Sequence, residues 1–111
     1  MSDARVDLPA MLRQAQELSE KLRRAQEALR HRTVSATVGG GLVEVTVSGA
    51  LEIVGVRIDP HAVDPRDVAL LQDLVRAAAN QVLARAKQLA QEEMQRASGL
   101  PLPLGGLGGA A

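Results

Sequence analysis

The 111-residue sequence contains no cysteine, phenylalanine, tyrosine or tryptophan. Without cysteine the chain has neither disulfides nor thiolate metal sites, which fits a reducing compartment. Without aromatic side chains it cannot stack bases as modules for single-stranded nucleic acid do. The sequence also lacks a run of apolar residues that could span a membrane and the apolar core of a signal peptide. A soluble, cytoplasmic protein without a membrane partner is therefore predicted.

The hydrophobic core must be built from Leu, Val, Ile, Ala and Met alone. These side chains bury little area each, and 111 residues are near the lower limit for an independent domain. We predict one domain over residues 1–98, with further apolar surface buried in an oligomer. Residues 99–111 are rich in proline and glycine and are predicted to form a flexible tail.

Charge is segregated along the chain, although the formal net charge is zero. Residues 1–32 carry seven Lys or Arg against five Asp or Glu, and residues 76–111 carry four against two. Residues 33–75 carry only two cations against six acids. The two terminal parts are therefore basic and the middle is acidic, so the total charge does not exclude a polyanionic partner.

The middle of the chain, residues 39–60, shows the alternation of apolar residues that is typical of β-strands. The alternation covers Leu42–Ser48 and Leu51–Asp59, which predicts two strands that each bury one face. Three glycines at 39–41 permit the positive φ angles of a tight turn, so Thr33–Val38 is predicted to be a third strand. The three strands should form an antiparallel meander.

A long helix is predicted before this meander, from about Leu8 to Arg30, with Pro9 in its first turn. Apolar residues recur along it at intervals of three and four, and the helix would span roughly 35 Å. This stripe packs either on its own domain or on another chain. Since three short strands are too small to cover it, the second interpretation, a dimer, is favoured. The stripe consists of Leu8, Met11, Ala15, Leu18, Leu22, Ala25 and Leu29.

A second long helix is predicted from about Pro65 to Ala97, with Asp64 as its N-cap. One broad arc of this helix is apolar, which together with the meander predicts an α+β fold. Its polar face has no acid between Arg76 and Lys87. That face either accepts a polyanion or is an ordinary solvated surface.

The sequence offers little for catalysis or metal binding. His31 and His61 are its only conventional bases. The acids near His61, namely Asp59, Asp64 and Asp67, are better explained as caps and turn formers than as a metal site. The glycine triplet precedes a strand rather than a helix, so it is not a phosphate-binding loop. We therefore expect no enzyme activity, metal, cofactor or small-molecule substrate.

Three stretches together resemble the YbaB/EbfC family of bacterial nucleoid-associated proteins. They are residues 14–29 (QAQELSEKLRRAQEAL), residues 39–60 (GGGLVEVTVSGALEIVGVRIDP) and residues 73–94 (DLVRAAANQVLARAKQLAQEEM). The resemblance extends from about Met11 to the tail. Its most specific pieces are Gly41-Leu42-Val43, the run from Val45 to Gly49, Ile58-Asp59-Pro60 and the run from Asp73 to Ala78.

This resemblance implies a homodimer in which helical arms project from a joined β core like tweezers. It implies binding to double-stranded DNA with little or variable sequence preference, and a role in nucleoid organisation or gene expression. The family's DNA contacts are attributed to its helices rather than to a fixed motif. The alternative is a scaffold in replication or recombination whose helices bind another protein through apolar contacts that survive salt.

The candidate DNA contacts come from charge and helical periodicity in this sequence. Arg and Lys on the two helices would grip duplex phosphates, with a strong dependence on salt. Glu27 is the opposing acid expected beside the cations of the first helix. The candidates are Lys21, Arg23, Arg24, Arg30, Arg32, Arg76, Arg85 and Lys87.

Overall fold

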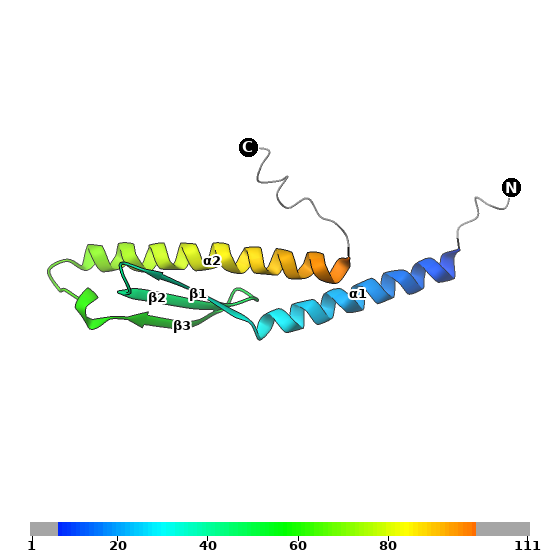
Figure 1. Ribbon diagram of the computed structural model, residues 1–111, viewed down its shortest axis with the longest axis horizontal. Coiled ribbons are helices and arrows are strands. Elements are labelled where there is room, and N and C mark those ends of the chain that lie inside the picture. Colours follow the sequence, from blue (N-terminus) through cyan, green and yellow to red (C-terminus); the bar gives the residue numbers. More distant parts are fainter. Residues whose placement is uncertain (1–6, 100–111) are drawn as a thin grey trace, which may run out of the picture.

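The computed structural model describes residues 7–99 and consists of two long helices and one small sheet (Figure 1). The sheet is antiparallel with the strand order β1-β2-β3. This arrangement confirms the predicted α+β fold. The elements are α1 (Leu8–Arg30), β1 (Thr33–Val38), β2 (Val43–Ser48), β3 (Ile53–Ile58), the short 3₁₀ helix η2 (Pro60–Ala62) and α2 (Val68–Ser98).

Helix α1 has the predicted bounds because both of its ends carry local signals. The carboxylate of Asp7 accepts a hydrogen bond from the backbone N–H of Ala10 at 3.3 Å, which makes Asp7 the N-cap. Pro9 lies in the first turn, where its missing N–H costs nothing. At the other end the backbone N–H of His31 donates to the carbonyl of Ala28 at 3.1 Å.

The turn between β1 and β2 depends on glycine. Gly39, Gly40 and Gly41 have φ angles of 66°, 69° and 101°, which residues with a Cβ rarely adopt. This confirms the role predicted for the glycine triplet. Directly after the turn, Val38 pairs with Val43, and the antiparallel register continues to Thr33 opposite Ser48.

The two faces of the sheet differ in polarity. On one face the hydroxyls of Ser35 and Thr46 are hydrogen-bonded at 2.7 Å, and Glu44 accepts a hydrogen bond from Arg57 on β3 at 3.3 Å. The other face carries the valines of β2, which are fully buried beneath α2. The core consists of Ala36, Val43, Val45, Val47, Ala78, Val82 and Ala86.

Helix α2 packs on β1 and β2 and leaves β3 largely uncovered. Ile53, Val56 and Ile58 pair with the buried valines of β2, so they share the apolar face of the sheet. Their exposed fractions are nevertheless 61%, 54% and 38%. The predicted burial of an apolar β3 face is therefore wrong for the single chain, because one helix is too narrow to cover three strands. We call these three residues the β3 strip.

Helix α2 begins at Val68 rather than near Pro65, and its N-cap is Asp67 rather than Asp64. The carboxylate of Asp67 accepts a hydrogen bond from the backbone N–H of Leu70 at 3.2 Å. Asp64 instead accepts one from the backbone N–H of Arg66 at 2.9 Å, which forms a local turn. The predicted start was wrong because two aspartates three residues apart offer equivalent caps.

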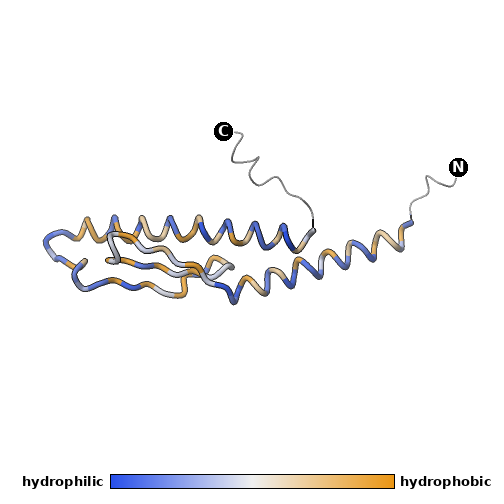
Figure 2. The backbone as a smooth tube through the Cα atoms, viewed as in Figure 1, coloured by the Kyte–Doolittle hydropathy of each residue, from blue (hydrophilic) through white to orange (hydrophobic). Residues whose placement is uncertain are grey.

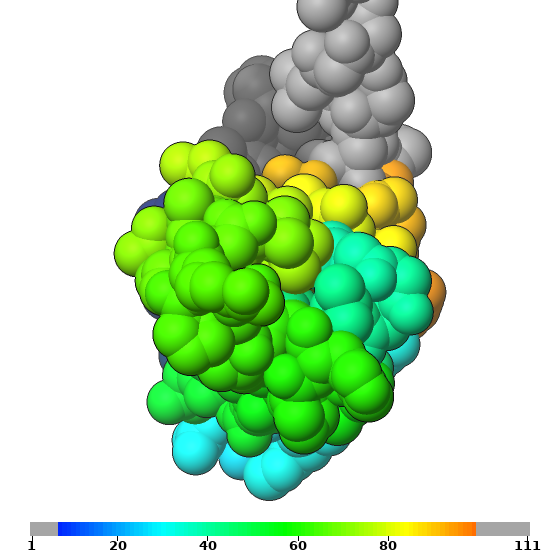
Figure 3. Space-filling model, turned by 90° about the vertical axis from the view of Figure 1, so that its left-hand side faces the viewer, coloured from blue at the N-terminus to red at the C-terminus, as the bar shows by residue number. Residues whose placement is uncertain are grey.

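The strands are also shorter than predicted at one turn. Leu51 has a φ of 66°, so it belongs to the turn, and β3 begins only at Ile53. At the opposite end of the sheet, η2 lies beside the β1–β2 turn, and the backbone N–H of Asp59 donates to the carbonyl of Leu42 at 2.8 Å. Figure 3 views this end, where the green segment around η2 and the start of α2 face the reader.

Helix α1 extends away from the sheet as an arm (Figure 1). Only the inner end of its apolar stripe is covered, where Ala25 and Leu29 are buried. Further out, Leu8 and Met11 are 64% and 53% exposed. Apolar residues nevertheless recur at each turn along the whole arm, as Figure 2 shows. The stripe is therefore longer than the surface that its own domain offers.

Candidate nucleic-acid interface

The direction of the arm is set by a close contact at its base. The β2–β3 turn meets the end of α1, where the backbone N–H of Gly49 donates to the carbonyls of Leu29 at 3.0 Å and Arg32 at 2.9 Å. The first carbonyl belongs to the last turn of α1, and the second belongs to the link between α1 and β1. The hydroxyl of the buried Ser48 accepts hydrogen bonds from Ala50 and Glu52 and holds the turn in shape.

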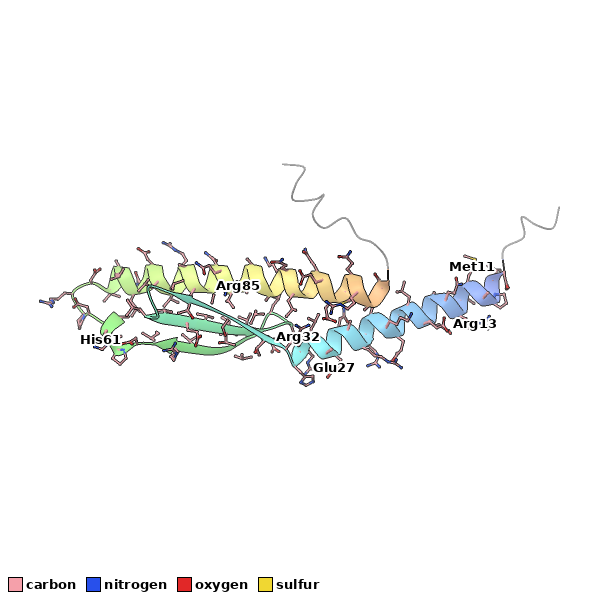
Figure 4. All side chains as sticks on the ribbon, viewed as in Figure 1. Met11, Arg13, Glu27, Arg32, His61 and Arg85 are labelled. Carbon is pink, nitrogen blue, oxygen red and sulfur yellow. The ribbon has the colours of Figure 1, made fainter. Side chains whose placement is uncertain are left out.

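Two of the predicted DNA contacts serve the fold. Arg32 donates to Glu93 on α2 at 2.7 Å, and Arg96 donates to the same carboxylate at 2.8 Å. Glu93 is only 18% exposed, so this pair joins the base of the arm to α2. Arg85 of α2 donates to the backbone carbonyl of Ser35 on β1 at 2.6 Å. Figure 4 shows Arg32 between the two helices and Arg85 on α2.

Three further cations of α1, Arg13, Lys21 and Arg24, share a side of the arm that is distinct from the apolar stripe. Arg13 and Arg24 are separated by three helical turns and so project from the same side. Together with Lys21 they line one shallow surface depression of about 410 Å³. Met11, from the stripe, and Arg13 project from different sides of the helix in Figure 4. Arg23 lies at the edge of this side, next to the stripe, where it lines another depression with Leu18 and Leu22. We call Arg13, Lys21, Arg23 and Arg24 together the basic face of α1.

One acid, Glu20, lies within this basic face and contacts two of its arginines. Arg23 donates to Glu20 through Nη2 at 2.5 Å and Nε at 3.1 Å, and Arg24 donates through Nε at 3.1 Å. The hydrogen bond from Arg23, its charge and the second arginine lower the pKa of Glu20 to about 2. Glu20 therefore stays ionised. The acid predicted to oppose these cations, Glu27, acts beside it, because its charge helps to raise the pKa of Arg23.

Glu27 has other partners at the end of α1. It accepts a hydrogen bond from Arg30 at 3.4 Å and contacts Nε2 of His31 at 3.3 Å. On α2, Arg76 is paired with Asp73 at 2.8 Å. Lys87 makes no ion pair with any residue in the range 7–99, and neither does Lys21.

Lys87 instead lines a groove of about 660 Å³ between α1, the β2–β3 turn and α2. The groove has apolar walls from Leu29, Leu51 and Met94. Arg23 and Arg30 also line it, so cations from both helices surround an apolar floor.

The sequence-based set of contacts omitted two residues of the basic face. Arg13 lies on the same side as Arg24 and is exposed, without an ion pair to a described residue. Glu20 was overlooked as the partner of Arg23 and Arg24. The signal for both was available in their helical spacing, since residues three, four and eleven apart share a side.

The acids around His61 have local structural roles, as predicted. Asp59 accepts hydrogen bonds from the backbone N–H of His61 at 2.8 Å and contacts Nδ1 of its ring at 2.7 Å. The backbone bond is the main cause of the lowered pKa of Asp59. Within residues 7–99 no cluster of three His, Asp or Glu is arranged to hold a metal ion. Over the same range, neither helix is both long and apolar enough to cross a bilayer.

Comparison with known proteins identifies the family. The sequence profile of the YbaB/EbfC DNA-binding family matches residues 4–100. The chain belongs to the YbaB/EbfC DNA-binding family. This is a family of nucleoid-associated DNA-binding proteins and not of enzymes.

Relatives of similar length support this membership. A nucleoid-associated protein of Pelotomaculum thermopropionicum is 42% identical over 93 residues, which cover 84% of this chain and 89% of the relative. A nucleoid-associated protein of Mycolicibacterium vanbaalenii is 47% identical over 102 residues, which cover 92% and 90% of the two chains.

The fold of the YbaB/EbfC chain also occurs in a solved structure. The uncharacterized protein HP0035 from Helicobacter pylori matches it with a TM-score of 0.71, over 78% of this chain and 91% of that one. The sequence identity is 18%, so this match concerns the fold alone.

Proposed function

We propose that this YbaB/EbfC protein is a homodimer that binds double-stranded DNA through the basic faces of its α1 arms. The observation that carries the proposal is the position of Arg13, Lys21, Arg23 and Arg24 on a projecting helix. The other side of that helix is apolar, so one side is suited to protein contacts and the other to an anion. A role in organising the nucleoid or in gene expression follows from this activity.

The chemistry of the basic face favours phosphate contacts over base reading. Guanidinium and ammonium groups bind phosphate oxygens, and such contacts carry no sequence information directly. The described residues include no aromatic side chain that could stack on a base, and the cations are spread along a helix side rather than gathered at one end. Binding of low sequence specificity, with a duplex lying along the arm, is therefore expected.

The β3 strip supports dimerisation. Since each valine or isoleucine of this strip is about half exposed, burying the remainder would contribute about 1 kcal/mol per residue. Leu51, in the turn before β3, adopts a left-handed φ of 66° while its side chain is 44% exposed. This conformation costs about 1–2 kcal/mol, and the exposed side chain recovers little of that in a single chain. A second copy packed on β3 would bury both the strip and Leu51.

Duplex binding should weaken steeply as salt rises. We expect fluorescence anisotropy of a labelled random-sequence duplex to give a log–log slope of binding constant against salt of about −4. Each phosphate contact by the basic face contributes to this slope through counterion release. Absence of binding even at low salt would contradict the proposal, and so would binding that is insensitive to salt.

Val56→Glu should convert the dimer into a monomer. The substitution places a charge in the middle of the β3 strip, where a partner chain would have to desolvate it. Sedimentation velocity at about 10 μM protein would report the change in mass.

The matched control is Val68→Glu. Val68 is 51% exposed, nearly as much as Val56, but it lies at the start of α2 and outside the strip. The control should remain dimeric, with helix content unchanged by circular dichroism. A Val56→Glu protein that stays dimeric would show that the two chains meet elsewhere.

A second function, a scaffold that grips another protein, is favoured by the apolar groove between α1 and α2. Leu29, Leu51 and Met94 offer the kind of anchor surface into which an amphipathic helix packs. The salt titration separates the two functions, because apolar contacts survive salt that removes phosphate contacts.

A further inference from the structure

Two acids, Glu17 and Glu20, lie beside the cations of the basic face, and they differ in the contacts that they make. Glu20 uses both carboxylate oxygens: Oε1 accepts from Nε of Arg23, and Oε2 accepts from Nη2 of Arg23 and Nε of Arg24. Glu17 lines the same surface depression but makes no ion pair with a residue in the range 7–99. One of two neighbouring carboxylates therefore holds half of the four cations.

These contacts occupy the groups that a phosphate would need. An arginine binds phosphate most strongly when two N–H groups of its fork point at two oxygens. In Arg23 the Nε and Nη2 groups of that fork are both directed at Glu20. Arg23 and Arg24 remain accessible, with 64% and 73% of their side chains exposed. The guanidinium groups are thus at the surface, but their strongest binding edge is already used.

We propose that Glu20 sets the DNA affinity of the basic face by competing with phosphate for Arg23 and Arg24. This inference rests on the proposed DNA-binding function and adds its regulation. A phosphate that approaches the arm must displace the carboxylate from two arginines or bind beside it against charge repulsion. Arg13 and Lys21, which Glu20 does not contact, remain available for the first encounter. The protein therefore binds duplex less tightly than its cations alone would allow.

The test compares Glu20→Gln with Glu17→Gln, which remove the same charge from the same side of α1. If Glu20 is a competitor, Glu20→Gln should bind a random-sequence duplex about fivefold more tightly than Glu17→Gln at low salt. Its log–log salt slope should also be steeper by about four, because two more arginines on each of the two arms contact phosphates. Thermal unfolding and sedimentation of both variants check that helix and assembly are unchanged.

The outcomes separate this inference from the proposed function. Equal gains in affinity for both variants would overturn the role of Glu20, since net charge alone would then explain them. Duplex binding by the wild-type protein with no gain for Glu20→Gln would overturn it as well, while leaving DNA binding in place. Failure of all three proteins to bind duplex at low salt would overturn the proposed function together with this inference.

Discussion

Gly49→Ala is expected to lower the free energy of unfolding by about 2–3 kcal/mol. A Cβ added to Gly49 would lie 2.6 Å from the carbonyl oxygen of Leu29 and 2.8 Å from its Cδ2 atom. The oxygen belongs to the backbone at the end of α1, so it cannot rotate away as a side chain could. The methyl group would also lengthen the hydrogen bond from the backbone N–H of Gly49 to this carbonyl. Urea unfolding followed by circular dichroism, at one fixed protein concentration, would measure the loss.

Gly55→Ala is the control for this prediction. A Cβ at Gly55 would meet only the Cβ of Thr46, at the ordinary contact distance of 3.9 Å. Stability should therefore change little, or rise slightly as chain entropy of the unfolded state falls. If Gly49→Ala proved as stable as Gly55→Ala, the turn would not be the fixed contact that orients the arm. Gly49 thus allows the backbone of the β2–β3 turn to lie close to the backbone at the end of α1, in addition to its place in the turn.

The double variant Arg23→Glu, Arg24→Glu reverses two charges on the arm. It should bind duplex more weakly than the wild-type protein, on the order of tenfold to hundredfold at low salt. The substitution replaces two cations on each arm with acids, which repel phosphates. It also frees Glu20 from its partners, so that three acids then face the DNA from successive turns. Anisotropy titrations with a labelled duplex would measure the affinity, and sedimentation would check that the assembly is retained.

The control carries the same change of charge at another place. Arg57, on the polar face of the sheet, and Arg66, before α2, are both exposed and both paired with an acid. Reversing these two should weaken binding much less, because they lie away from the basic face. Equal losses in the two double variants would mean that net charge, rather than the arm, determines affinity. Unchanged affinity after reversal of Arg23 and Arg24 would exclude these residues as contacts.

Much of the candidate site could be predicted from spacing along one helix. The cations of α1 and the sides on which they lie follow from a period of 3.6 residues, which needs no tertiary information. Arg32 and Arg85 also carry charge on helices or beside them, and so they entered the predicted set. Their partners, Glu93 and the carbonyl of Ser35, are 61 and 50 residues away in sequence. No local pattern could predict that these two arginines tie elements together.

The sequence by itself determined the elements whose signals are local. Helix α1 kept its predicted bounds because its cap and its stripe lie within the helix, and the β1–β2 turn followed from three glycines. The tertiary structure alone decided where α2 begins, since Asp64 and Asp67 are equivalent caps. The tertiary structure alone also decided that β3 stays uncovered. The alternation of apolar residues predicts which face of each strand is apolar, but not how many strands one helix can cover. Local hydrogen bonding and periodicity are encoded in neighbouring residues, whereas coverage and close approach depend on how distant segments pack.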